Sequence, residues 1–270
     1  ETKKSISTLS CNHVVSPNRV LALSVPSGPC NKKFDFTFSH RFNEDMIQDL
    51  GRSIVNFSKN VKGGIVIFFP SFSYLQHVLN YWKRSTSEIF QRLSQRKKVL
   101  IEPESSTQVE SILELYTNAI YPKVNQDNNY NGGILLCVVG GKMSEGINFK
   151  NDLCRVVIMV GLPYPNPHDI ELKERMEYLK KTIDHNAGNV YYQNLCMRAV
   201  NQSIGRAIRH KLDYGAILLM DYRYQRQNIY ESIPDWIKKS YIKCNSFQKA
   251  FQPFCKFINN MKREESHKSN

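Results

Sequence analysis

Four apolar runs constrain the fold of this chain more than any other feature of its sequence. They lie at residues 65–69, 134–139, 155–160 and 216–221, and each has the length of a short strand. A strand with one face in solvent alternates between apolar and polar residues, whereas a strand covered on both faces stays apolar throughout. Because segments with helical apolar spacing separate these runs, the pattern predicts an α/β fold, in which helices cover both faces of a parallel sheet.

The segments between the runs carry apolar residues three or four positions apart, which is the spacing of a helix with one buried face. These predicted helices lie at about 46–57, 75–82, 109–120 and 172–183. Further strands are predicted at 20–25 and 98–101, residues 34–38 fit a half-buried strand or an extended lead-in, and the run at 216–221 is expected to close the sheet.

We expect a single α/β domain with a short extension at each end. Residues 1–13 are a lead-in, residues 14–245 form the domain, and residues 246–270 form a C-terminal helix and a polar tail. Phenylalanines at helical spacing predict the helix up to about residue 262. The remaining residues are polar and charged, and we expect them to be disordered.

Charge and cysteine usage narrow the class of protein. Lys and Arg number 37 against 24 Asp and Glu, so the net charge of +13 suggests nucleic acid as a partner, with an anionic membrane or a merely basic surface as the alternatives. The seven cysteines form no C-x-x-C pair, which argues against a zinc ribbon or a disulfide framework and for reduced thiols in cytosol or nucleus. No apolar run reaches the length of about 18 residues that a membrane span needs.

Three loops are predicted at the carboxyl ends of the strands, where open parallel sheets bind their ligands. They are residues 70–71, 140–149 and 221–224. The second is not a P-loop, because Leu136 and Met143 stand where that motif needs Gly and Ser or Thr. Its glycines would still let backbone amides approach a ligand, although a tight turn between strand and helix explains them as well.

The stretch 201–210 is predicted to be the end of a helix with a basic face. Gln202, Arg206 and Arg209 share one stripe at this spacing, and guanidinium groups suit phosphate oxygens. A solvated basic face is the alternative, but Gly205 inside a helix indicates close approach of a backbone or ligand. The parallel-sheet interpretation places this helix near the ligand-binding edge. By itself the chain lacks the acidic metal-binding pair needed to bind a Mg-nucleotide and activate water.

Three of these stretches resemble motifs of the XPD-like, iron–sulfur group of superfamily two helicases. Residues 64–71 are similar to motif IV, residues 141–149 to motif V and residues 202–210 to motif VI. Within the group, residues 138–149 are most similar to the Chl1 branch, and Asn148 stands where XPD itself carries Asp. The likeness covers about residues 14–245 and identifies the domain as the second RecA-like, or C-terminal, helicase domain.

The resemblance implies a role for each motif. Motif VI would supply Arg206 and Arg209 as arginine fingers to ATP and Mg²⁺ held by the first motor domain, which would also carry the 4Fe–4S cluster. The nucleotide would be lined by Gln202, Glu145, Gly146 and Asn148, and single-stranded DNA would face Ser71, Tyr74, Lys142 and Ser144. The role of Arg223 stays open, because an ion pair within the domain would explain it equally well.

The function that the resemblance implies is the second motor domain of an ATP-dependent DNA helicase with 5′-to-3′ polarity. The full-length protein would act on single-stranded or forked DNA in the nucleus, in DNA repair or chromosome cohesion. Its partners would be its own N-terminal helicase domain and replication or cohesion factors. We expect no membrane among its partners. The alternative is a non-catalytic basic nucleic-acid-binding module with a RecA-like fold. A cofactor-dependent transferase is weaker, because no G-x-G-x-x-G fingerprint opens the first helix.

Overall fold

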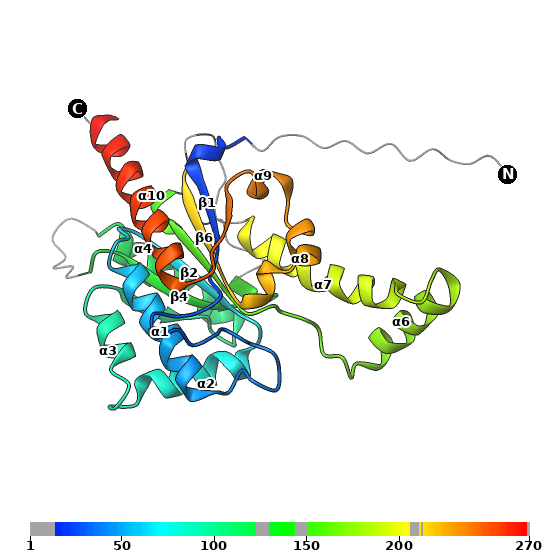
Figure 1. Ribbon diagram of the computed structural model, residues 1–270. Coiled ribbons are helices and arrows are strands. Elements are labelled where there is room, and N and C mark those ends of the chain that lie inside the picture. Colours follow the sequence, from blue (N-terminus) through cyan, green and yellow to red (C-terminus); the bar gives the residue numbers. More distant parts are fainter. Residues whose placement is uncertain are drawn as a thin grey trace.

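One parallel sheet organises the domain, as Figure 1 shows for the computed structural model, which describes residues 14–122, 130–143, 149, 151–205, 211 and 213–268. Seven strands lie in the order β3-β4-β2-β5-β6-β1-β7, and every pairing between them is parallel. They are β1 (Val20–Ser24), β2 (Ile65–Phe69), β3 (Lys98–Ile101), β4 (Gly133–Val138), β5 (Val156–Val160), β6 (Gly215–Met220) and β7 (Tyr241–Lys243). The predicted α/β class is confirmed.

Both faces of the sheet are buried, which explains the uninterrupted apolar runs. Along β2, Ile65 and Phe69 belong to one core cluster, while Val66 and Phe68 belong to the other. Successive side chains of a strand point to opposite faces, so each strand contributes to both clusters. The first cluster lies under α1 (Glu44–Ser58), α2 (Phe72–Lys83), α3 (Ile89–Ser94) and α10 (Phe247–Lys268). The second lies under α4 (Val109–Ile120), α7 (Ala187–Ile204), α8 (Gln227–Glu231) and α9 (Asp235–Lys238).

A helical hairpin projects from this body on the right of Figure 1. It consists of α6 (Ile170–Thr182) and the first part of α7. Leu172 is the one buried residue of α6, whereas the second half of α7 buries Met197, Val200 and Ile204 in the core. The chain therefore leaves the body after β5, turns in the hairpin, and returns through α7 toward β6.

The order of the strands corrects one prediction. The run at 216–221 was expected to close the sheet, but β6 lies between β5 and β1. The edge belongs instead to β7, which pairs with β1 and which we did not predict. A three-residue strand whose side chains are mostly exposed is too short to show a period of two, so only its pairing partner reveals it.

The polar C-terminal segment is also ordered where we expected disorder, because α10 continues to Lys268. Tertiary contacts hold its last turns. Arg19 forms an ion pair of 2.7 Å with Glu264, and the ammonium group of Lys262 donates a hydrogen bond of 2.8 Å to the carbonyl oxygen of Asn60. Two charged side chains of this segment, Lys262 and Glu264, therefore contact the body of the domain.

Residues 34–38 form an extended lead-in outside the sheet, which is one of the two predicted alternatives. Phe34 and Phe36 are buried while Asp35 and Thr37 are partly exposed, as their period of two requires. The described part of the chain also has four 3-10 helices, which are η1 (Pro17–Arg19), η2 (Ser106–Gln108), η3 (Asn151–Leu153) and η4 (Tyr222–Gln225). Each of the six cysteines in the described part of the chain is a free thiol. None of the helices within the described ranges is long and apolar enough to cross a membrane.

Candidate nucleotide and nucleic-acid interface

The loops that follow β2, β4 and β6 meet at the carboxyl edge of the sheet, because all three strands are parallel. Ser71 begins this edge at the turn from β2 into α2. Its backbone is extended, and its hydroxyl oxygen accepts a hydrogen bond of 3.3 Å from the backbone N–H of Tyr74. Ser71 is therefore the N-cap of α2, and it presents a partly exposed polar side chain at the edge predicted to bind a ligand.

Tyr74 does not face this surface, so its predicted contact with DNA is wrong. Its side chain is fully buried, and its ring packs at 6.3 Å from the ring of Phe36 and 6.3 Å from that of Phe69. The phenol donates a hydrogen bond of 2.9 Å to the carbonyl oxygen of Arg41, and burial raises its pKa. The first turn of α2 directs this position into the core, where the ring cannot stack on a base.

Lys142 lies at the same edge, in the loop after β4. Gly140 has a φ of +73°, a conformation that favours glycine, and the turn directs Lys142 outward into solvent. Its ammonium group donates a hydrogen bond to the carbonyl oxygen of Glu104. The predicted residues Ser144, Glu145, Gly146 and Asn148 lie outside the described residues.

A buried carboxylate that we did not predict holds the start of this loop. Glu102 follows β3 and is 3% exposed. Its two oxygens accept hydrogen bonds of 2.7 Å from the backbone N–H of Val138 and 2.8 Å from that of Met143. Burial raises the pKa of Glu102, and these hydrogen bonds and Lys142 oppose that shift. An acidic residue directly after an apolar strand was the one sequence signal for it.

A second buried carboxylate settles the open question about Arg223. Asp221 is fully buried and Arg223 is 7% exposed. The guanidinium donates hydrogen bonds of 2.9 Å and 2.7 Å to the two oxygens of Asp221, so the ion pair lies within the domain. Asp221 also accepts a hydrogen bond of 3.3 Å from the backbone N–H of Phe36, which ties the lead-in at 34–38 to the carboxyl edge.

The predicted basic helix ends earlier than its sequence pattern indicates. The structure ends α7 at Ile204, and Gly205 is its C-cap with φ −66° and ψ −8°. Among the described residues, a Cβ on Gly205 would meet only atoms of the preceding turn, 3.0 Å from the carbonyl oxygen of Asn201, so no other described segment makes the expected close approach. Arg206 and Arg209 lie outside the described residues.

Gln202 is exposed in the last turn of α7 and lies beside an open hollow of about 610 Å³. The hollow is lined by Asn194, Met197, Arg198, Asn201, Gln202 and Ser232. Arg198 is exposed one turn before Gln202, and the buried Oδ1 of Asn201 has no hydrogen-bond partner among the described residues. The hollow is thus bordered by the cation of Arg198, the amide of Gln202 and the unpaired acceptor Oδ1 of Asn201, as far as the described residues show. Of these three residues, only Gln202 was predicted.

This end of α7 lies away from the carboxyl edge. The helix returns the chain from the end of β5 to the start of β6, and Gly215 is only ten positions beyond Gly205. Tyr192, near the other end of α7, donates a hydrogen bond of 2.8 Å to the carbonyl oxygen of Pro165, just after β5. The structure therefore does not bring Gln202 together with Ser71 and Lys142, contrary to our placement of this helix at the ligand-binding edge.

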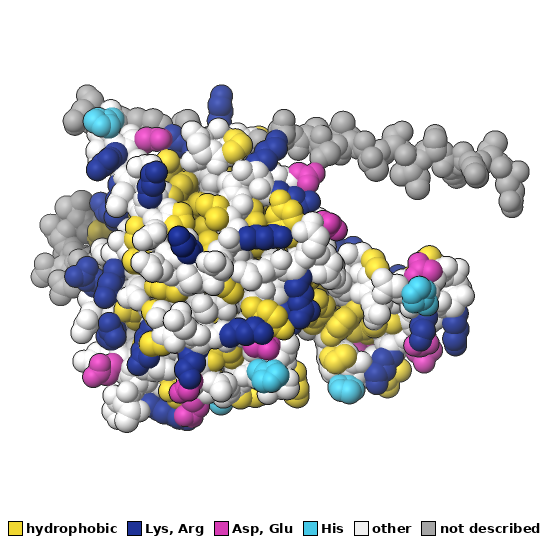
Figure 2. Space-filling model, in the orientation of Figure 1, with side chains coloured by type: hydrophobic (Ala, Val, Ile, Leu, Met, Phe, Trp, Pro, Cys, Tyr) yellow, Lys and Arg dark blue, Asp and Glu magenta, His cyan; other side chains and the backbone are white. Residues whose placement is uncertain are grey.

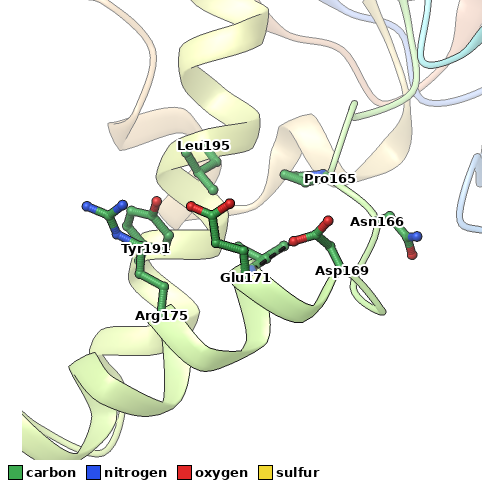
Figure 3. Close-up of a pocket in the computed structure, with 8 residues that line it drawn as sticks. Pro165, Asn166, Asp169, Glu171, Arg175, Tyr191 and Leu195 are labelled. Carbon is green, nitrogen blue, oxygen red and sulfur yellow. Dashed lines mark hydrogen bonds between the residues drawn. The ribbon is translucent and has the colours of Figure 1, made fainter.

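A smaller cavity of about 250 Å³ lies at the base of the hairpin, between α6 and α7 (Figure 3). Figure 3 shows Asp169 at the start of α6, where its carboxylate accepts a hydrogen bond of 2.9 Å from the backbone N–H of Leu172. The guanidinium of Arg175 lies 5.4 Å from the centre of the Tyr191 ring. Asp169 therefore caps α6, and Arg175 joins α6 to α7.

The fold is that of solved XPD helicases. An XPD helicase matches with a TM-score of 0.58 and 20% identity, over 83% of this chain and 35% of that one. Xpd4 of S. tokodaii matches with a TM-score of 0.56 and 21% identity, over 84% of this chain and 38% of that one. The architecture is therefore the RecA-like fold of these structures.

Sequence comparison gives the family. Residues 54–240 match the helicase C-terminal domain. The ATP-dependent DNA helicase DDX11 of Mus musculus is 43% identical over 96% of this chain, and the ATP-dependent DNA helicase CHL1 of Scheffersomyces stipitis is 41% identical over 87% of it. The chain belongs to the helicase C-terminal domain family, in the Chl1 branch of the XPD-like helicases. It spans 29% and 28% of the length of these two relatives.

Proposed function

We propose that this chain is the second motor domain of an ATP-dependent DNA helicase, which closes on ATP held by a first motor domain and moves along single-stranded DNA. The observation that carries the proposal is the separation of two polar surfaces in a domain of this family. Ser71 and Lys142 lie at the carboxyl edge of the sheet, whereas Gln202 and Arg198 lie beside the hollow at the end of α7. A motor needs two such surfaces, because it must bind nucleotide and DNA at the same time.

The α7 surface is assigned to the nucleotide. Gln202 borders the hollow, and the chain after α7 would carry Arg206 and Arg209 as arginine fingers, which are worth about 10³ to 10⁵ in rate. The family resemblance also assigns Glu145, Gly146 and Asn148 of motif V to the nucleotide. No group of three or more acidic, His or Cys side chains within the described ranges is arranged to hold a metal ion. The family resemblance assigns Mg²⁺ and a 4Fe–4S cluster to the first motor domain.

The carboxyl edge is assigned to single-stranded or forked DNA through Ser71, Lys142 and Ser144. The net charge of +13 favours such a partner, and Figure 2 shows Lys and Arg side chains spread over one whole face of the domain. From the family resemblance we further propose a nuclear protein with 5′-to-3′ polarity, a role in DNA repair or chromosome cohesion, and replication or cohesion factors as partners.

The test is the substitution Arg209→Ala in the full-length protein. DNA-stimulated ATP hydrolysis should fall by about 10³-fold or more, because an arginine finger acts on the transition state, while the affinity for single-stranded DNA stays unchanged. Lys62→Ala, at an exposed position before β2, is the matched loss of one positive charge and should have no effect on hydrolysis. Turnover near the wild-type rate in Arg209→Ala would remove the assignment.

The isolated chain provides a second measurement. It should bind single-stranded DNA weakly and hydrolyse no ATP, because it holds only half of the proposed site. If the wild-type full-length protein bound DNA without hydrolysing ATP, the alternative of a non-catalytic nucleic-acid-binding module would replace the proposal.

A further inference from the structure

Two phenylalanines are exposed on the loop that leads into α1. Phe38 is 78% exposed and Phe42 is 45% exposed, and Arg41 lies between them in the sequence. We call these three residues the aromatic–arginine cluster. Neighbouring large apolar side chains that are left in solvent are a common mark of a binding surface.

Arg41 unites the cluster. The central carbon of its guanidinium lies 4.7 Å from the centre of the Phe38 ring and 4.9 Å from that of Phe42. It also lies 5.4 Å from the centre of the buried Tyr74 ring. A cation within about 6 Å of an aromatic face is attracted by the ring quadrupole, so the two exposed rings and the partly exposed guanidinium form one surface.

Two polar atoms of this surface have no hydrogen-bond partner within the described part of the chain. They are the buried Nε of Arg41 and the buried Nε2 of His77. The ring of His77 lies 4.8 Å from that of Phe42 at an interplanar angle of 80°, so the histidine borders the cluster. Unsatisfied buried polar atoms are rare and are commonly completed by a ligand or by water.

Three hydrogen bonds hold the loop that carries the cluster. The backbone N–H of Arg41 donates a hydrogen bond of 2.9 Å to the carbonyl oxygen of Thr37, and its own carbonyl oxygen accepts one from Tyr74. The hydrogen bond from Phe36 to Asp221 anchors the start of the loop. Since Tyr74 is in the first turn of α2, the cluster lies beside the helix end that Ser71 caps.

The acidic groups near the cluster are already paired, so its charge is open to an anion. The carboxylate of Asp35 accepts a hydrogen bond of 2.8 Å from the hydroxyl of Thr37 and lies 3.6 Å from Nδ1 of His40. Glu44 forms an ion pair of 2.6 Å with Arg84. Exposed aromatic faces and a positive charge together match a ligand that offers flat rings and phosphates.

We propose that the aromatic–arginine cluster is a stacking site for the unpaired bases of single-stranded DNA, with Phe38 and Phe42 contacting bases and Arg41 contacting a phosphate. The inference rests on the proposed function and extends it, because it assigns base contacts to a loop outside the three helicase motifs. The cluster supplies the exposed aromatic rings for DNA contact that the buried Tyr74 cannot supply. A peptide partner is the competing occupant and is decided by the test below.

The test compares Phe38→Ala and Arg41→Ala in the full-length protein, by fluorescence anisotropy with an oligothymidylate and with an abasic strand of the same length. Phe38→Ala should weaken binding to the oligothymidylate by about tenfold and binding to the abasic strand hardly at all, because base stacking is lost and phosphate contacts remain. Arg41→Ala should weaken binding to both strands and lower the salt dependence by about 0.7, the value for one phosphate contact. Phe38→Trp should restore binding.

Tyr121→Ala and Lys62→Ala are the controls, because Tyr121 is 44% exposed at the end of α4 and both residues precede strands, at the opposite edge of the sheet. Neither should change binding. If Phe38→Ala bound both strands as the wild type does, the inference would be overturned and a peptide partner favoured. If the wild-type protein bound neither strand, the proposed function itself would fail, and the two failures are thereby distinguished.

Discussion

Asp221 holds the guanidinium of Arg223 through two hydrogen bonds of 2.9 Å and 2.7 Å, and both side chains are buried at the carboxyl edge of the sheet. The same carboxylate accepts a hydrogen bond from the backbone N–H of Phe36. One side chain thus joins the end of β6 to the loop that carries the aromatic–arginine cluster. It shapes the candidate DNA surface without being exposed on it.

Asp221→Ala should lower the free energy of unfolding by about 3–5 kcal/mol, because it leaves a buried guanidinium without its partner. Urea denaturation followed by circular dichroism measures the change. Asp45→Ala, which removes an exposed ion pair with Lys32, is the matched control and should have little effect. Equal losses in the two variants would show that the burial of the Asp221–Arg223 pair is unimportant.

Glu102→Gln should loosen the start of the loop at 140–149. An amide offers one oxygen where the carboxylate offers two, so the backbone N–H of Val138 or Met143 loses its acceptor. We expect a loss of about 1–3 kcal/mol in unfolding free energy, the cost of one unsatisfied buried donor, and faster hydrogen exchange at these two amides.

The exposed Glu104 supplies the comparison for this loop. Glu104→Gln should leave the exchange rates of both amides as they are in the wild type. Unchanged exchange in Glu102→Gln would mean that the carboxylate does not hold the loop.

The buried Lys97 should make the free energy of unfolding depend on pH. Its ammonium group is buried and donates hydrogen bonds of 2.8 Å to the carbonyl oxygens of Val61 and Gly63, and burial lowers its pKa to about 7. Between that value and the unfolded pKa of about 10.4, the unfolded chain binds the extra proton, so the contribution of Lys97 to stability rises with pH. Below pH 7 both states are protonated, and the contribution is constant.

Lys97→Met should remove this rise, which amounts to at most about 1.4 kcal/mol per pH unit. Denaturation of wild type and variant at pH 7, 8, 9 and 10 measures the difference, and groups common to both proteins cancel. The partly exposed Lys98 offers the control, Lys98→Met, whose profile should run parallel to that of the wild type. If the stability of Lys97→Met also changed with pH in parallel with the wild type, the lowered pKa of Lys97 would be contradicted.

Local patterns predicted much of this fold because they report burial directly. The runs at 65–69 and 134–139 became β2 and β4, and the spacing at 46–57 became α1. The order of three motifs was sufficient to recognise the family that the comparisons confirm. Arg206, Arg209 and most of motif V lie outside the described residues, so their roles remain proposals.

The sequence by itself determined the longer elements and the parallel class of the sheet, because the apolar period of a segment depends only on its own residues, and its motifs identified the family. Only the tertiary structure decided that β7 forms the edge, that Tyr74 points into the core, and that α7 ends away from the carboxyl edge. It alone paired Glu102 with Met143 and Asp221 with Phe36, which lie 41 and 185 positions apart. Contacts across such separations depend on how whole elements pack, and no local pattern encodes them.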